Sequence, residues 1–527
     1  MDKIHNSLQI LDYVVVFIYI IALVSLGYWV SFVKKKKKNE NLFLAGHSLK
    51  WYSIGLNMWG TNVGPSMLIA SAASGFSVGI AGANFSWFGF LFIMALAMVF
   101  APFYRTTKVS TLPEFIGKRY SERTRELLAW YSLITILLSW LGITLYTGGL
   151  LVSQILGWPL WISMTSLTTL AAFFAIAGGL EAIAITNIFQ MVLLIIVSLG
   201  LTITGIIKVG GITNVYEAVP AKFWILFRPN SDLNYPWLPI VLGYPVMAIW
   251  FYCTDQSMVQ SVLAAKNLKQ GQLGVNMNGW LKIIDMPLFI LPGIICFILF
   301  PDLASPEEAY ATMVMNLMPV GIIGLVMAVL IAALVSTIDS ALNSVSTIFT
   351  LDIFVRRFKP YASQKEIIRI GRIVALIAAV FGVFIGLGIS SIQIDDLYIM
   401  LQSILAFLAP PMSVVFLIGI LWKRATPAAA NLVLSLGSVI SIGIGVCSLW
   451  NIPSKEFWPH PLLLSFFVFV GLMALAILVS LATMKNYQGS SLPPLKQILS
   501  KNGSSRSIWF LWVALGILTI ALYIFFN

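Results

Sequence analysis

Side-chain oxygens recur at helical spacing in the stretch IAALVSTIDSALNSVST, residues 331–347. Ser336, Ser340 and Asn343 stand at positions i, i+4 and i+7, which share one face of a helix, and Thr337 follows Ser336 directly. Hydroxyl and amide oxygens gathered on one face are able to coordinate a small, hard cation of the sodium type. The alternative is that they join two helices by hydrogen bonds.

A carboxylate, Asp339, lies in the same stretch, one helical turn from Ser336. Its surroundings are largely apolar, and an ionised group in such a setting is costly unless a cation or another partner meets it. The combination favours an ion site at which Asp339 neutralises sodium. The alternative is that Asp339 carries a proton.

The stretch NMWGTNVGPSM, residues 57–67, interrupts a long apolar run. Gly60, Gly64 and Pro65 disfavour a continuous helix there. A discontinuous helix would free backbone carbonyls for a cation and turn a half-helix end toward a solute. The alternative is a proline kink with close helix packing. The side chains that add oxygens or a donor are Thr61, Asn62 and Ser66.

Further polar residues stand in or beside apolar runs. Lys282 is followed three residues later by Asp285, so either the two form an ion pair or they serve a site. Gln402 is alone among apolar neighbours and needs hydrogen-bond partners from another helix or from a polar solute. Asp255 and Gln256 close a run, where a helix cap or a salt bridge is the simpler interpretation.

These residues lie in a chain that is 59% hydrophobic and 10% charged, against about 25% charged in soluble domains. Apolar runs of roughly 18 or more residues, each long enough to span a bilayer, recur throughout. They predict an all-α polytopic membrane protein with about 14 transmembrane helices. The expected spans are residues 11–32, 50–74, 84–104, 127–154, 159–178, 182–208, 237–260, 278–300, 318–350, 368–390, 396–420, 427–449, 461–484 and 508–526.

The net charge of +12 reflects topology rather than nucleic-acid binding. With the N-terminus outside, most Lys and Arg fall on the inner side, including the lysine run 34–38 and the loop 105–125. We expect a multi-pass protein of the cell inner (plasma) membrane. Its expected partners are a small-molecule substrate and the lipid bilayer, with no obligate protein partner.

Enzyme motifs are absent from the sequence. The three His are scattered outside the predicted spans, and no Cys/His metal cluster, P-loop or GxSxG elbow occurs. The chain is therefore not expected to be an enzyme or to draw on ATP itself.

Four stretches carry a resemblance to a known family. FLAGHSLKWYSIGLNMWGTN (43–62), GGLEAIAITNIFQ (178–190), CTDQSMVQSVLAAKN (253–267) and NSVSTIFTLDIF (343–354) resemble the sodium:solute symporter family, most closely its sodium/glucose cotransporter branch. The motifs keep the family's order over roughly residues 10–425.

The resemblance implies a LeuT-type core of two inverted five-helix repeats, residues 50–208 and 237–420. The helix that opens each repeat is expected to be discontinuous. Residues 1–49 would hold the outside N-terminus, a first span and a basic inner loop, and residues 427–527 would form peripheral spans.

The resemblance also implies a co-transported Na⁺. Carried over position by position, the backbone carbonyls of Gly60, Val63 and Ala333 and the hydroxyls of Ser336 and Thr337 would hold it.

Some relatives use an Asp on the sixth span for a second sodium ion, and Asn187 stands at that position here. Our hypothesis is that Asp339, beside Ser340, replaces the missing carboxylate.

The implied solute site matches only in part. Asn62, Lys282 and Gln402 are kept, whereas Ser86 replaces a Glu, and Phe251 replaces a Tyr gate. The expected function is sodium-coupled import, by alternating access, of a sugar or sugar derivative. The alternative is a sodium- or proton-coupled symporter for a polyol, a carboxylate or an amino-acid-like solute.

Overall fold

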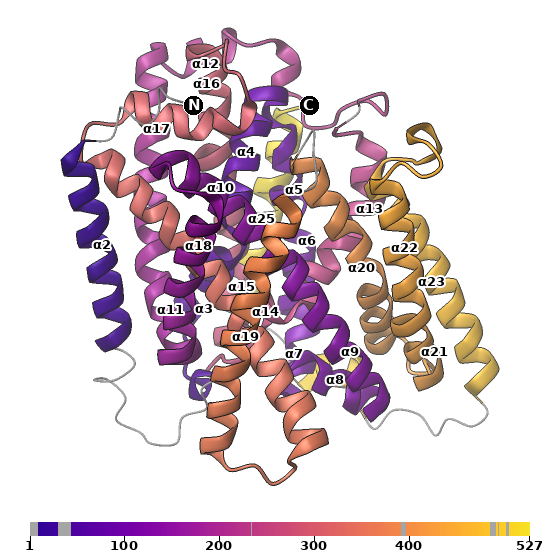
Figure 1. The fold of residues 1–527 in the computed structure, drawn as a ribbon. Helices are drawn as coiled ribbons and strands as arrows, with labels where there is room; N and C mark the ends of the chain where they lie inside the picture. The colour runs from indigo at the N-terminus through magenta and orange to yellow at the C-terminus, as the bar shows by residue number, and fades with distance from the viewer. Residues whose placement is uncertain are drawn as a thin grey trace.

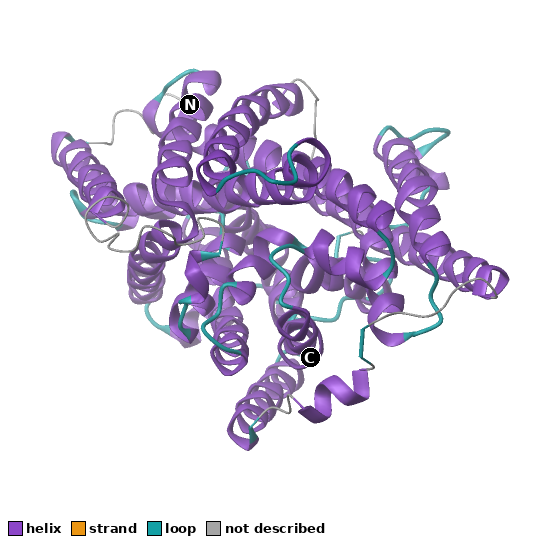
Figure 2. Cartoon of the chain, turned by 90° about the horizontal axis from the view of Figure 1, so that it is seen from below, coloured by secondary structure: helices purple, strands orange, loops and turns teal. Residues whose placement is uncertain are grey.

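The structure is a computed structural model that describes residues 9–29, 44–232, 234–390, 397–484, 492–493, 495–501 and 505–527. Within these residues the regular structure is helical apart from two isolated bridges, Leu49 with Ala265 and Arg228 with Pro236. Helices gather into one bundle, and most of them run between its two ends (Figures 1 and 2). The all-α class is confirmed.

The helices of the first half are α2 Ile10–Tyr28, α3 Trp51–Asn62, α4 Pro65–Val78, α5 Ala83–Trp87, α6 Phe90–Ala95, α7 Ala101–Thr107, α8 Leu112–Arg119, α9 Glu122–Thr135, α10 Thr144–Leu156, α11 Leu160–Val209 and α12 Ile212–Glu217. Those of the second half are α13 Trp237–Ala248, α14 Gln256–Leu263, α15 Leu268–Asp285, α16 Leu291–Leu299, α17 Ala309–Leu317, α18 Ile322–Ile348, α19 Gln364–Ser390, α20 Leu397–Leu421, α21 Pro427–Leu432, α22 Ser438–Leu449, α23 Pro461–Thr483, α24 Leu495–Lys501 and α25 Arg506–Phe525. Six π-helical stretches join some of them, namely Leu96–Phe100, Ile136–Ile143, Ile249–Thr254, Met286–Ile290, Phe349–Phe358 and Val433–Gly437.

Eleven helical runs of the described residues are long and apolar enough to cross a membrane, and Ile10–Leu26 and Leu160–Phe173 are shorter apolar helices. The predicted count of about 14 is not reproduced by this criterion. One reason is that the predicted break divides the expected span 50–74 between α3, which has only 12 residues, and α4. The multi-pass character is confirmed.

The predicted spans 159–178 and 182–208 fall within one helical element, α11, of 50 residues. A straight helix of that length would be ~75 Å long, more than twice the ~30 Å hydrocarbon core. Its membrane-length parts are Leu160–Phe173 and Ala184–Val209. These two parts match the two predicted spans. The predicted interruption between residues 178 and 182 is absent, because the helix continues through it.

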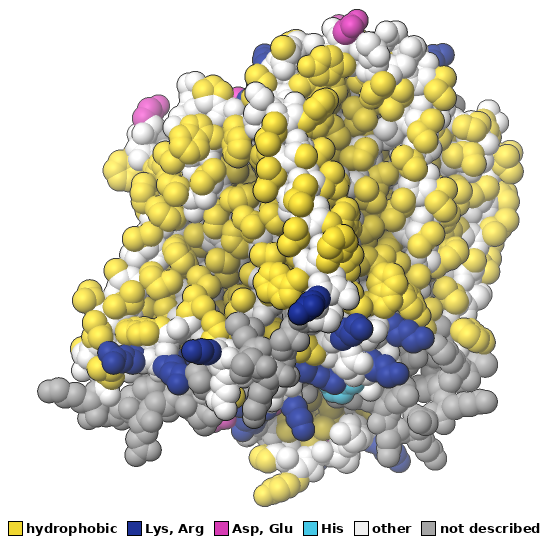
Figure 3. Space-filling model, turned by 180° about the vertical axis from the view of Figure 1, so that it is seen from behind, with side chains coloured by type: hydrophobic (Ala, Val, Ile, Leu, Met, Phe, Trp, Pro, Cys, Tyr) yellow, Lys and Arg dark blue, Asp and Glu magenta, His cyan; other side chains and the backbone are white. Residues whose placement is uncertain are grey.

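Charge and apolar surface are segregated on the molecule. Hydrophobic side chains cover a broad band, and most Lys and Arg in this view gather at one end (Figure 3). Large apolar side chains stay exposed on the outer helices, as Phe384 on α19 (66%) and Phe510 on α25 (72%) illustrate. Such a band is the surface expected to face lipid tails.

The first predicted helix break is present. Helix α3 ends at Asn62, Val63 leaves helical geometry with φ −82° and ψ 65°, and α4 begins at Pro65 after an extended Gly64. Pro65 suits the first turn of a helix because its missing N–H would have no partner there. The glycines and the proline therefore separate two half-helices, as the sequence predicted.

The second predicted break is also present. Helix α13 passes into the π-helical stretch Ile249–Thr254, and Asp255 is extended with φ −85° and ψ 130°. The Asp255 carboxylate accepts hydrogen bonds from the backbone N–H groups of Ser257 (2.9 Å) and Met258 (3.3 Å), so it caps α14. The interpretation of Asp255 as a helix cap is confirmed.

Candidate ion and solute site

Helix α18 packs against the break between α3 and α4. The Thr337 hydroxyl lies 3.2 Å from the Ala333 carbonyl oxygen and 3.4 Å from that of Thr61. A Cβ added to Gly64 would lie 3.1 Å from the Thr337 oxygen. The glycine thus lets this hydroxyl approach the backbone of the break.

Ser336, one residue before Thr337, is fully buried. Its hydroxyl has no hydrogen-bond partner among the described residues. Burial of an unpaired hydroxyl is unfavourable, and coordination of a cation would satisfy it. Ala333 and Val63 are fully buried as well. The five predicted ligand positions therefore lie on the two elements that meet here, and their chemistry fits sodium.

Several buried polar atoms on α18 lack partners within the described chain. Besides Ser336, these are Asp339 Oδ1 and Asn343 Nδ2. The three residues follow at i, i+3 and i+7, which is one face of the helix. Asp339 is only 1% exposed. An oxygen of a buried carboxylate without a donor is a strong reason to look for a cation or a proton at this face.

Two buried amide oxygens on α11 also lack partners in the described residues, Asn187 Oδ1 and Gln190 Oε1. The other end of the Asn187 amide donates to the Asn57 side chain on α3. Gln190 was not singled out in the sequence. Its signal would have been an amide side chain one turn after Asn187 in a largely apolar helix.

The predicted partner Ser340 is engaged with the break. Its hydroxyl lies 3.0 Å from the hydroxyl of Thr61, which itself donates to the Asn57 carbonyl at 2.9 Å. Asn57 in turn donates to the side chain of Ser261 on α14. Polar contacts thus connect α3, the half-helix before the first break, with α14 and with α18.

A cavity of about 160 Å³ opens beside this junction. It is lined by both sides of the first break, by α10 and the π-helical stretch Ile136–Ile143 before it, and by α13 with the π-helical stretch that follows it. Of the predicted solute ligands, Asn62, Phe251 and Lys282 line it, together with Met67 and Ala248. Other polar lining side chains are Ser71, Ser74, Ser139, Thr144, Tyr244, Tyr252 and Thr337.

One predicted solute ligand, Ser86, does not line the cavity, and the side chain of another, Gln402, is not described. Ser86 is buried and points instead to Asp285, whose carboxylate oxygen Oδ2 it reaches at 2.8 Å. The side chain of Gln402 lies outside the described residues, although Leu405, one turn later on α20, lines the cavity. Ser86 is therefore a supporting residue and not a direct contact.

Lys282 does not carry a free charge. Its Nζ lies 2.8 Å from Asp285 Oδ2, and both side chains are 1% exposed. The indole N–H of Trp59 donates to Asp285 Oδ1, also at 2.8 Å. The ion pair that the sequence offered as one alternative is confirmed, and it compensates the charge of Lys282.

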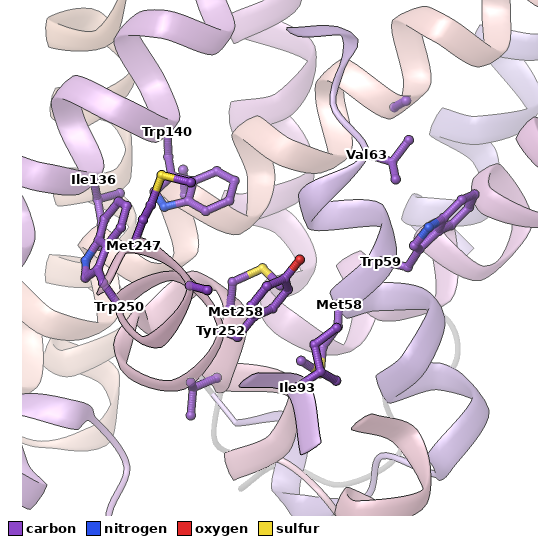
Figure 4. Packing of buried hydrophobic residues seen from close by; sticks show 14 of the residues in the cluster. Met58, Trp59, Val63, Ile93, Ile136, Trp140, Met247, Trp250, Tyr252 and Met258 are labelled. Carbon is purple, nitrogen blue, oxygen red and sulfur yellow. The ribbon is translucent and has the colours of Figure 1, made fainter. Parts of the chain in front are cut away.

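Aromatic side chains close one wall of the cavity. Phe251 packs on Trp140 with ring centroids 5.3 Å apart and on Tyr252 at 4.9 Å. In Figure 4 Tyr252 lies between Trp140, Met247 and Trp250 on one side and Met58 and Ile93 on the other. The Tyr252 hydroxyl interacts with the side chains of Asn62 and Tyr244. The sequence analysis missed both tyrosines, although WFY at 250–252 was a visible aromatic run.

Comparison with known proteins gives consistent matches. The model of the sodium:solute symporter family matches residues 42–437. The chain is 33% identical over 471 residues to sodium/glucose cotransporter 4 of Danio rerio, which covers 83% of this chain and 72% of that protein. It is 30% identical over 476 residues to sodium/myo-inositol cotransporter 2 of Bos taurus, with 83% and 70% covered. Over 466 residues it is 33% identical to sodium/mannose cotransporter SLC5A10 of Bos taurus, with 81% and 77% covered.

Solved structures share the fold. A Na⁺-coupled sialic acid symporter in a substrate-bound, outward-open state superposes with a TM-score of 0.77 at 20% identity, covering 92% of this chain and all of that one. Mhp1, a nucleobase-cation-symport-1 family transporter, gives 0.53 at 12% identity, covering 88% and 96%. The LeuT-type architecture is thereby confirmed.

Proposed function

The chain belongs to the sodium:solute symporter family, and from that membership we propose that it couples sodium entry to the import of a neutral, hydroxyl-rich solute. It is a transporter and not an enzyme. One observation carries the proposal: Gly64 and Thr337 lie at the proposed ion site and also line the solute cavity. Ion and solute would therefore bind at adjoining positions that share the Gly64 backbone and the Thr337 side chain.

The proposed sodium ligands are the carbonyls of Gly60, Val63 and Ala333 and the hydroxyls of Ser336 and Thr337. An ion at this position would tie α18 to the break and so hold the half-helices that shape the cavity. Solute binding would then depend on sodium, because an ion can favour only the conformation to which it binds more tightly. Closure of the outer side and opening of the inner side would release both.

The cavity's chemistry supports a monosaccharide or cyclitol over a carboxylate. Lys282 is compensated by Asp285, and the remaining polar groups are the amide of Asn62 and several hydroxyls. Amide and hydroxyl groups both donate and accept, as recognition of a polyol requires. The relatives are named for glucose, myo-inositol and mannose, which are all neutral polyols. We propose Asn62, Phe251, Lys282 and Gln402 as contacts, with Ser86 in support.

We further propose a second ion site around Asp339, Ser340 and Asn187, to which Gln190 is added. The support is the set of buried oxygens that lack partners in the described chain, Asp339 Oδ1, Asn187 Oδ1 and Gln190 Oε1. A sodium ion would satisfy carboxylate and amide oxygens together. A proton on Asp339 is the competing explanation, and it would leave the amide oxygens unpaired.

We also propose the arrangement of the repeats and the orientation in the membrane from the family membership. Residues 50–208 and 237–420 would be the inverted repeats, each opened by a broken helix, with 1–49 and 427–527 peripheral. The basic end in Figure 3 would face the cytoplasm of a cell whose plasma membrane holds the protein, with the N-terminus outside.

Uptake by purified protein in liposomes tests the function. Labelled hexoses, myo-inositol, a hexuronate and an amino acid are offered under an inward sodium gradient, a potassium gradient and a proton gradient. We expect saturable uptake of one neutral polyol with sodium alone. Uptake driven only by protons, or uptake of the carboxylate alone, would overturn the proposal.

A further inference from the structure

We propose that Asp285 is a positioning residue that sets the charge selectivity of the solute cavity, acting through Lys282. The inference rests on the proposed function and goes beyond it by naming what excludes charged solutes. Asp285 was noted in the sequence only as a partner for Lys282. The structure gives it three partners, which come from three different helices.

The carboxylate of Asp285 is held by three donors. Its Oδ2 is 2.8 Å from Lys282 Nζ and accepts from the Ser86 hydroxyl at 2.8 Å, and its Oδ1 accepts from the Trp59 indole at 2.8 Å. Helices α15, α5 and α3 supply these donors, and Asp285 is 1% exposed. Every one of these contacts stabilises the ionised carboxylate.

Lys282 lines the cavity whereas Asp285 does not, so the carboxylate lies behind the ammonium group. Among the described lining residues, Lys282 is also the sole Lys, Arg, Asp or Glu. The charge presented to the solute is therefore decided by whether Asp285 neutralises Lys282. Within the described residues Lys282 Nζ has Asp285 as its hydrogen-bond partner, so two of the three ammonium donors remain for solute hydroxyls.

An anionic solute would have to compete with Asp285 for the same ammonium group. A cationic solute would meet the ammonium itself, without access to the carboxylate. Binding of either charged solute is therefore disfavoured. The cation is repelled by the ammonium group, and the anion finds that group already paired with Asp285. Removal of the Asp285 carboxylate should therefore admit anionic solutes. Removal of the Lys282 ammonium group should admit cationic solutes.

The experiment measures inhibition of sodium-driven uptake of the neutral substrate in proteoliposomes. Unlabelled glucose, glucuronate and glucosamine are the competitors, which are matched in ring and differ in charge. For Asp285→Asn we expect the half-inhibitory concentration of glucuronate relative to glucose to fall by roughly tenfold or more. For Lys282→Met we expect the same shift for glucosamine. Asp285→Glu keeps the charge and should restore the wild-type ratios.

The two arms keep the inference testable if one variant does not fold, since each can be judged alone after a size-exclusion check. A variant that lacks uptake is measured by sodium-dependent binding of labelled neutral substrate with the same competitors. Unchanged competitor ratios in the folded variants would overturn this inference alone. A wild-type protein that takes up no neutral solute in a sodium gradient would overturn the proposed function instead, so the two failures are distinguishable.

Discussion

Thr337 approaches Gly64 so closely that a methyl group on Gly64 would lie 3.1 Å from the threonine hydroxyl oxygen. That separation is tighter than ordinary van der Waals contact, so the hydroxyl would have to move. We expect Gly64→Ala to raise the sodium concentration for half-maximal uptake by roughly tenfold, equivalent to about 1.4 kcal/mol. The physical reason is displacement of a sodium ligand without loss of any polar group.

The matched control is Gly443→Ala on α22, where an added Cβ meets nothing within 4 Å. Sodium titrations of uptake by both variants make the comparison. An unchanged sodium requirement in Gly64→Ala would place the ion away from this contact.

Ser336→Ala provides a second prediction, which concerns the affinity for sodium and not the packing of helices. Because the Ser336 hydroxyl has no partner among the described residues, its removal should not lower thermal stability in sodium-free buffer. The sodium requirement of uptake should rise by roughly tenfold. Ser346→Ala is the contrast, since that hydroxyl donates to the Gly371 carbonyl at 2.7 Å, and its loss should cost about 1 kcal/mol of stability with sodium dependence unchanged. The reverse pattern would make Ser336 a structural residue.

The first helix break was predictable from sequence because glycine and proline act on the local backbone, whereas the second break, at Asp255, was expected only from the family resemblance. The pairing of Lys282 with Asp285 was predictable for a similar reason, since residues three apart share a helix face. The bonds from Asp285 to Ser86 and Trp59 were not, because they join positions 199 and 226 residues apart. Such contacts depend on how helices pack, which one sequence does not encode in any local pattern.

Because contacts between distant helices are not visible in the sequence, some residues of the solute site were misassigned or missed. Ser86 was expected to touch the solute because its position does so in relatives, but a serine is too short and has Asp285 within reach. Gln190 and Tyr244 were overlooked because a single polar or aromatic residue in a span is common. Only the structure distinguishes them. It shows that Gln190 Oε1 is buried without a partner in the described chain and that Tyr244 lines the cavity.

His460 leads to a prediction on pH. Its Nδ1 accepts a hydrogen bond from the Leu462 backbone N–H at 3.3 Å, which caps α23, and burial lowers the pKa of His460. A pKa below the unfolded value means that stability is greatest above about pH 6.5 and falls as pH drops through it. Between about pH 7.5 and pH 5.5, the melting temperature should therefore fall further in the wild type than in His460→Asn, whose amide caps at either pH. Equal falls would show that this cap does not govern acid sensitivity.

Asp339 provides the prediction with the greatest consequence for energetics. One sodium ion entering down ~100 mV contributes roughly 2.3 kcal/mol, and a tenfold concentration gradient adds about 1.4 kcal/mol. The sum of ~3.7 kcal/mol supports roughly a 500-fold solute gradient, and a second ion would square it. With two sites, Asp339→Asn should lower the Hill coefficient for sodium from about 2 to about 1 and reduce maximal accumulation accordingly.

The measurement is sodium-dependent uptake at fixed pH, with the ratio of ²²Na⁺ to solute counted in the same liposomes. Asp302→Asn, at an exposed position, is the matched control and should leave the ratio unchanged. A ratio of one in the wild type that Asp339→Asn does not alter would exclude the second sodium site. If wild-type uptake instead tracks the proton gradient and this dependence disappears in Asp339→Asn, the carboxylate carries a proton, and the amide oxygens of Asn187 and Gln190 need another explanation.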